Sequence, residues 1–207
     1  MSLQTEPTTT PASHLLDSAG HETELPSVPE TGTVLVVEDD RDLAETYAIW
    51  LDREYDVRLA ASAYEAREVM DADVDVALVD RRLPDGNGVD VATDVLSVQP
   101  SCHVGYITAV QPSVDLVDMP ADAYVEKPVT ERDIHSVVDE LFARTCFDDA
   151  DVREFFATTT KLDVLRERAL PESVDAPAAE DPALVALRER HAEQRDAIAE
   201  RLKQFVR

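Results

Sequence analysis

The chain has 207 residues, of which 44% are hydrophobic, and its formal net charge is −25 at pH 7. This length allows one domain of roughly 100 to 150 residues with a smaller appendage, and it excludes two independent enzymes. No stretch approaches the roughly 20 apolar residues of a membrane helix, and the N-terminus MSLQTEPTTTPASHLL lacks the basic and apolar regions of a signal peptide. We therefore expect a cytoplasmic protein without membrane insertion.

Acidic residues outnumber basic residues by 44 to 19, and only three of the basic residues are lysines. Self-repulsion at this charge destabilises a compact chain in dilute buffer, whereas molar salt shortens the Debye length to about 3 Å and removes most of the penalty. An acidic surface for a basic ligand would concentrate the acids in one patch, but here they are spread along the chain. The composition therefore predicts a halophile's protein.

Residues 1–30 contain five acids, no lysine or arginine, and many Thr, Ser and Pro residues. Without a periodic apolar pattern, this segment is predicted to be a disordered acidic tail. From Thr31 onward, short apolar runs typical of buried parallel strands appear. These runs predict strands at Val34–Val37, Val76–Val79, Val104–Ile107 and Ala123–Val125, and a further strand is expected near Tyr55–Ala60.

Between the strands lie stretches with apolar residues at helical spacing, which we assign to Asp42–Leu51, Ala63–Met70, Val89–Val98 and Glu131–Phe142. Alternation of strand and helix indicates the α/β class, with a doubly wound parallel five-stranded sheet that is covered by helices on both faces. Ligands of such sheets bind at the loops that follow the carboxyl ends of the strands.

The strands stop before residue 147, and residues 147–207 are predicted to form a helical hairpin. Asp151–Leu170 has apolar residues near helical spacing, and a Pro-rich connector follows. Asp181 and Pro182 form an N-cap and first-turn pair that opens a second helix. Its apolar stripe is interrupted by His191 and Gln194, which more often fix the register of a seam than bind a metal.

Polar residues leave the strand ends at four loops: Glu38-Asp39-Asp40, Asp80, Thr108 and Lys127. Carboxylates gathered at one sheet edge repel each other unless a cation lies among them, and an all-oxygen set suits Mg²⁺. A carboxylate beside Mg²⁺ can attack a phosphoryl group, while a nearby ammonium and hydroxyl bind the oxygens that gain charge.

With these four loops in this order, residues 31–145 resemble a response regulator receiver domain of flavodoxin-like fold. The resemblance implies that Asp80 accepts a phosphoryl group, that Thr108 and Lys127 contact it, and that Thr108 and Tyr124 form the switch. It implies a Mg²⁺ site made by Asp39, Asp40, Asp80 and the backbone carbonyl of Arg82, with Glu38 nearby. It also implies a cis peptide bond before Pro128.

The stretch AVQPSVDLVDMPAD between Thr108 and Ala123 departs from the family pattern. Its two prolines predict that the fourth helix is short or irregular, because proline removes a helix donor and clashes with the preceding turn. A dimer arrangement copied from typical receivers is therefore not expected, although a homodimer through the helical hairpin or a receiver face stays open.

Residues 147–207 resemble the HalX domain that follows receivers in haloarchaea, in the FFATTTKLDVL stretch and in the second helix. That resemblance implies a helical output domain. The segment still carries a net charge of −4, so a salt-bridged helical face is favoured over a nucleic-acid face. Its output partner, DNA or protein, is left open.

We therefore expect a two-component response regulator, not an enzyme, that a sensor histidine kinase phosphorylates on Asp80. Two other functions compete with this one. A Mg²⁺-dependent phosphohydrolase commonly needs an acid/base Asp two residues after the nucleophile, where this chain has Arg82. A phosphate-independent, receiver-like interaction scaffold is disfavoured by the complete set of acidic, hydroxyl and lysine residues.

Overall fold

The computed structural model describes residues 32–145, 149–168 and 181–205. The predicted tail of residues 1–30 and the connector over residues 171–180 lie outside the described residues. Within the described part of the chain, no helix combines the length and the hydropathy that crossing a membrane requires.

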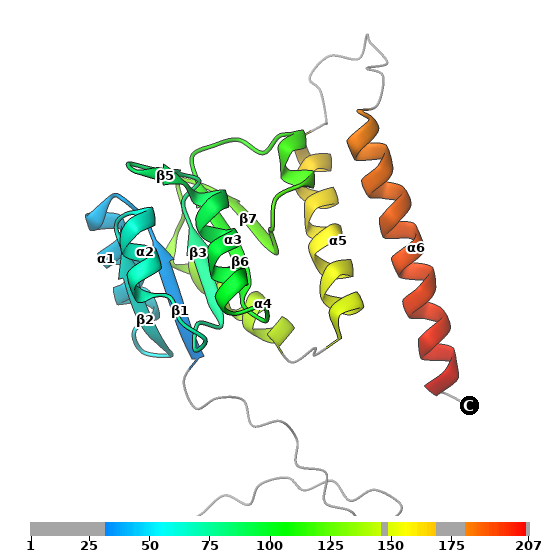
Figure 1. Cartoon of the computed structure of the whole chain (residues 1–207), viewed down its shortest axis with the longest axis horizontal. Coiled ribbons are helices and arrows are strands. Elements are labelled where there is room, and N and C mark those ends of the chain that lie inside the picture. Colours follow the sequence, from blue (N-terminus) through cyan, green and yellow to red (C-terminus); the bar gives the residue numbers. More distant parts are fainter. Residues whose placement is uncertain (1–31, 146–148, 169–180, 206–207) are drawn as a thin grey trace, which may run out of the picture. The chain divides into compact units, whose positions relative to one another are not determined.

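Five parallel strands form one sheet in the order β2-β1-β3-β6-β7 (Figure 1). This is the flavodoxin-like order, in which the second strand lies at one edge of the sheet. The predicted fold class is therefore confirmed, and the strand bounds lie close to those expected from the apolar runs. The strands are β1 (Gly32–Val37), β2 (Tyr55–Ala60), β3 (Val76–Val79), β6 (His103–Thr108) and β7 (Ala123–Glu126).

Helices cover both faces of the sheet, because alternate residues of each buried strand point to opposite sides. Val34 and Val36 of β1 pack with apolar residues of α1 and α4, whereas Leu35 and Val37 pack with those of α2 and α3. These helices are α1 (Arg41–Leu51), α2 (Ala63–Val69), α3 (Gly88–Val98) and α4 (Glu131–Thr145).

A two-stranded hairpin follows β3 and was not predicted. Arg82–Leu83 (β4) pairs antiparallel with Gly86–Asn87 (β5). Asp85 lies in its turn, and its carboxylate accepts hydrogen bonds from the backbone N–H groups of Ala63 at 2.8 Å and Tyr64 at 2.9 Å. The turn therefore satisfies unpaired donors at the start of α2.

We expect Asp85→Ala to lower the thermal unfolding midpoint, because two N-terminal donors of α2 lose their acceptor. The two backbone hydrogen bonds also hold the pKa of Asp85 below its usual range. A lowered pKa means that this stabilisation is present above the carboxyl's unfolded pKa and is lost as pH falls through the folded one. The difference between Asp85→Ala and the parent should therefore shrink in acid, as thermal scans at several pH values would measure.

The segment between β6 and β7 contains a single 3₁₀ turn, η1 (Val114–Val117), in the place of a full fourth helix. Pro112 precedes this turn and Pro120 follows it. The prediction of a short or irregular element is thus confirmed. Leu116 and Val117 are buried on the same side of the sheet as α2 and α3.

The predicted C-terminal helices form the expected antiparallel hairpin of α5 (Ala150–Arg168) and α6 (Pro182–Phe205), seen in yellow and red in Figure 1. Arg201 near the end of α6 pairs with Asp149, just before α5, and with Asp151. In the seam, the ring of His191 stacks on Phe155 with centroids 4.9 Å apart. Leu162, Leu165 and Leu187 are buried in the same apolar cluster as Leu116 and Val117.

Candidate functional site

The acidic and basic residues of the predicted site meet at the carboxyl edge of the sheet, because the strands that carry them end there. Asp80 follows β3 directly, and its N–H donates to the carbonyl of Val37 at 2.9 Å. The N–H of Lys127 donates to the carbonyl of Thr108 at 2.9 Å, so the ends of β6 and β7 are held together. The cis peptide bond between Lys127 and Pro128 is present as predicted.

Lys127 bridges two carboxylates. Its Nζ lies 2.5 Å from Oε2 of Glu38 and 2.6 Å from Oδ2 of Asp80. The Glu38 side chain is 3% exposed and the Asp80 side chain 9%. Burial lowers the pKa of Lys127, but the hydrogen bonds that its ammonium donates to Asp80 and Glu38 outweigh this effect, so that the pKa is raised overall. The ammonium therefore stays charged beside the acids.

Burial raises the pKa of Glu38, and its contacts with Lys127 only partly offset this effect. A single ammonium thus compensates two buried carboxylates incompletely, since desolvation disfavours each charged form. Such an excess of negative charge favours the binding of a further cation at this edge of the sheet.

Thr108 is fully buried, and its hydroxyl donates to Oδ1 of Asp80 at 2.8 Å. The N–H of Arg82 donates to the same oxygen at 2.9 Å. Asp80 therefore has one oxygen facing Thr108 and Arg82 and the other facing Lys127. This brings together the three side chains predicted to handle a phosphoryl group.

The carboxylates able to share a metal ion among the described residues are Glu38, Asp39 and Asp80, with ligand atoms within 4.8 Å of one another. Asp40, which remains a predicted ligand, also contacts the start of α1. Its Oδ1 accepts from the N–H groups of Asp42 at 3.1 Å and Leu43 at 3.3 Å, and so it caps α1. An all-oxygen set of three carboxylates suits Mg²⁺.

Gly88 at the start of α3 lies against the backbone of the phosphoacceptor candidate. A Cβ at this position would lie 2.0 Å from the carbonyl oxygen of Asp80 and 2.9 Å from its carbonyl carbon. The Gly88 N–H also donates to the carbonyl of Arg81 at 3.0 Å. The close approach leaves no room for a side chain and requires glycine.

Tyr124, the predicted switch aromatic, lies on β7 and is half-buried. Its hydroxyl donates to the carbonyl of Val110 at 2.6 Å, two residues after Thr108. Its ring lies 6.0 Å from that of Tyr106. Tyr124 is thus connected to the segment that follows Thr108, as a coupled pair of switch residues requires.

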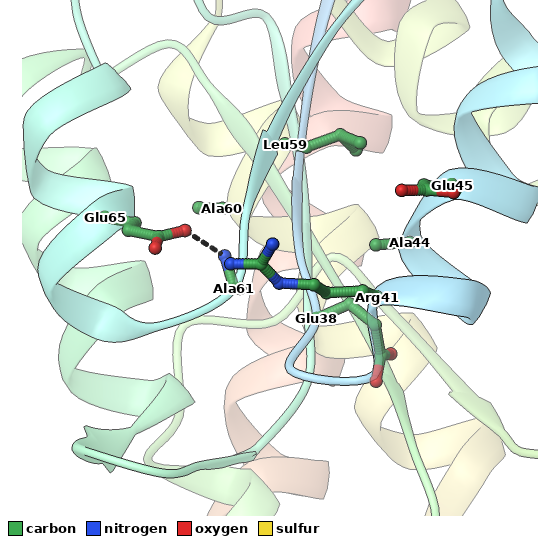
Figure 2. A pocket seen from close by; sticks show the side chains of 8 residues that line it. All are labelled: Glu38, Arg41, Ala44, Glu45, Leu59, Ala60, Ala61 and Glu65. Atoms are coloured by element: carbon green, nitrogen blue, oxygen red, sulfur yellow. Dashed lines mark hydrogen bonds between the residues drawn. The ribbon is translucent and has the colours of Figure 1, made fainter.

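A pocket of about 190 Å³ opens beside the acidic loop, between α1 and the β2–α2 junction. Figure 2 shows Arg41 extending across it toward Ala61 and Glu65, and Glu65 accepts a hydrogen bond from the Ala61 N–H at 2.8 Å. Glu38 contributes to its lining, whereas Asp80, Thr108 and Lys127 do not. The pocket is therefore a neighbour of the acidic site and not its centre.

A parallel sheet of this order, with an acidic cluster, a hydroxyl and a lysine at its carboxyl edge, defines a receiver-type signalling domain. In agreement, the family described as "Response regulator receiver domain" matches residues 34–139. This match covers half of the chain, and the chain belongs to that family.

Two named relatives are similar to part of this chain. A Haloferax volcanii protein named "Putative transcriptional regulator" is 42% identical over 149 residues, which are 72% of this chain and 25% of the relative. The response regulator SaeR of Staphylococcus epidermidis is 25% identical over 115 residues, which are 54% of this chain and 50% of SaeR. The chain thus spans about half or less of these relatives. The prediction of a halophile's protein fits the Haloferax relative.

Solved structures agree with the fold over the receiver part. A CheY-like receiver domain protein from Methanospirillum hungatei is 26% identical, with a TM-score of 0.52, and the likeness covers 56% of this chain and 96% of that one. The receiver domain of HemR from Leptospira biflexa is 25% identical with a TM-score of 0.51, covering 55% of this chain and 95% of HemR's receiver.

Proposed function

We propose that the protein is a two-component response regulator in which Asp80 accepts a phosphoryl group from a sensor histidine kinase. The observation that carries this proposal is the position of the Asp80 carboxylate between Lys127 at 2.6 Å and Thr108 at 2.8 Å. A nearly buried carboxylate with an ammonium on one oxygen and a hydroxyl on the other is a positioned nucleophile. Its neighbours are ready to bind the phosphoryl oxygens.

In the proposed transfer, a carboxylate oxygen of Asp80 attacks phosphorus in line with the departing imidazole nitrogen of the kinase. The P–N bond breaks, and the nitrogen keeps the electron pair. Lys127 offers its ammonium to one phosphoryl oxygen, and Thr108 donates its hydroxyl to another. When bound, Mg²⁺ would supply positive charge to the transferring group, and Asp39, Asp40, Asp80 and the Arg82 carbonyl are the proposed ligands, with Glu38 nearby. Asp40 also caps α1.

The proposed switch passes from Thr108 to Tyr124. A phosphoryl group adds about −1.5 to −2 of charge next to Thr108 and attracts its hydroxyl. Tyr124 is tied to the same segment through the Val110 carbonyl.

In the proposed domain organisation, residues 31–145 form the receiver, residues 1–30 a tail and residues 147–207 a HalX-like output domain. The output domain regulates transcription or a protein partner. The whole protein is cytoplasmic and is not itself an enzyme.

The test is the intact mass after incubation with acetyl phosphate and Mg²⁺ in molar KCl, comparing the parent with Asp80→Ala. We expect one phosphoryl group on the parent and none on the variant. If neither acquires a phosphoryl group, beryllofluoride binding distinguishes rapid hydrolysis from an inactive site. Absence of both signals would reject phosphorylation and favour a receiver-shaped interaction scaffold.

A further inference from the structure

Arg81, the residue after the proposed phosphoacceptor, reaches out of the site toward η1. Its Nη2 forms an ion pair with Oδ2 of Asp115 in η1, and its Nη1 lies 3.4 Å from the hydroxyl of Tyr124. The Arg81 side chain is only 13% exposed. The planar guanidinium holds its donors in a fixed fork, whereas a Lys ammonium is a point charge on a flexible stem.

Asp115 is held from both sides. Ser113 donates its hydroxyl to Oδ1, while Arg81 occupies Oδ2. Burial raises the pKa of Asp115. The hydrogen bonds that Ser113 and Arg81 donate to it lower the pKa by more, so that the net pKa lies below the usual range. The carboxylate therefore remains charged, and the ion pair persists at neutral pH.

On its other side, η1 contacts the C-terminal hairpin. Leu116 and Val117 share an apolar cluster with Leu162, Leu165 and Leu187 of α5 and α6. In addition, Nζ of Lys161 in α5 donates to the carbonyl of Val117 at 3.1 Å. A short turn without the internal hydrogen bonds of a full helix thus lies between the phosphorylation loop and the hairpin.

We propose that Arg81 is a positioning residue that couples the phosphorylation site to the hairpin, through its ion pair with Asp115 and the packing of η1 on α5 and α6. The proposal rests on the proposed function, since it needs a phosphoryl group at Asp80. A shift of the Asp80 backbone moves Arg81, its neighbour in the chain, and Arg81 moves η1 through Asp115. The competing explanation is a local surface ion pair, which typically contributes only about 0–1 kcal/mol and signals nothing.

Hydrogen–deuterium exchange of α5 tests the coupling, with and without beryllofluoride as a phosphoryl mimic, in molar KCl containing Mg²⁺. Bound beryllofluoride is measured separately by fluorine NMR. We expect a several-fold change in exchange over residues 150–168 of the parent. Arg81→Gln and Asp115→Asn should each abolish this change while beryllofluoride still binds. Asp115→Asn removes the ion pair without altering the neighbour of Asp80.

The matched control is Arg67→Gln, because Arg67 forms an ion pair with Asp94 between α2 and α3 at 2.7 Å, away from η1. This variant should keep the full response. The double variant Arg81→Asp with Asp115→Arg should recover part of the response. Such recovery would show that the single variants did not lose the response through loss of folding. If both single variants retain the response of the parent, or if the parent binds beryllofluoride without a change in α5, the coupling is rejected. A parent that neither binds beryllofluoride nor acquires a phosphoryl group from acetyl phosphate rejects the proposed function itself, and the coupling with it.

Discussion

Gly88→Ala is expected to destabilise the receiver and to impair phosphorylation of Asp80 together. The added Cβ would lie 2.0 Å from the Asp80 carbonyl oxygen, a distance that no pair of such atoms tolerates. The obstacle is backbone and cannot rotate away, so the start of α3 or the β3–β4 loop must move. Overpacking typically costs about 1–3 kcal/mol, and we expect the upper end of this range. Urea unfolding and phosphoryl incorporation measure the two effects.

Gly86→Ala is the matched control, because Gly86 lies two residues away in β5 and a Cβ there meets only Ala63 Cβ, at 3.2 Å. A shift of a few tenths of an ångström relieves that contact. We therefore expect a smaller loss of stability and normal phosphorylation. If Gly88→Ala were as stable as Gly86→Ala, the close approach of α3 to Asp80 would not exist in solution.

The sheet and its helices could be predicted because the central strands β1 and β3 are continuous apolar runs and the helices that cover the sheet repeat their apolar residues at a period near 3.6. The carboxyl edge followed from this pattern, since parallel strands bring their ends together. The places of Asp80, Thr108 and Lys127 at strand ends therefore predicted that their side chains would meet, as they do. The irregular η1 was predicted from its two prolines alone.

What the pattern missed depends on contacts between distant segments. Asp85 caps a helix that begins 22 residues earlier, and Arg81 pairs with Asp115, 34 residues later. Neither contact is indicated by the residues that neighbour it in the sequence. The cap made by Asp40, by contrast, is indicated locally, since an Asp directly before a helix is a typical N-cap. The structure shows this cap, and the role of Asp40 as a metal ligand stays a prediction. Glu38 lies in the carboxylate cluster with Asp39 and Asp80.

Lys127→Met should destabilise the protein by about 3 kcal/mol without Mg²⁺, because removing one partner of a buried ion pair leaves uncompensated charge. Lys127 Nζ lies 2.5 Å from Glu38 and 2.6 Å from Asp80, and its side chain is 15% exposed. Without the ammonium, the two carboxylates repel each other. Urea unfolding in molar KCl with EDTA measures the loss, and phosphoryl incorporation should fall as well, because a charge partner of the phosphoryl oxygens is missing.

Mg²⁺ should then stabilise Lys127→Met more than it stabilises the parent. A ligand that binds only the folded state stabilises it according to its affinity, and a second cation binds more tightly where the ammonium no longer competes for the same carboxylates. Lys161→Met is the control, because Lys161 donates to the Val117 carbonyl instead of an acid of the site. It should lose stability without a change in the Mg²⁺ response. An equal response to Mg²⁺ in parent and Lys127→Met would mean that the metal binds away from Glu38 and Asp80, and the proposed ligand set would be wrong.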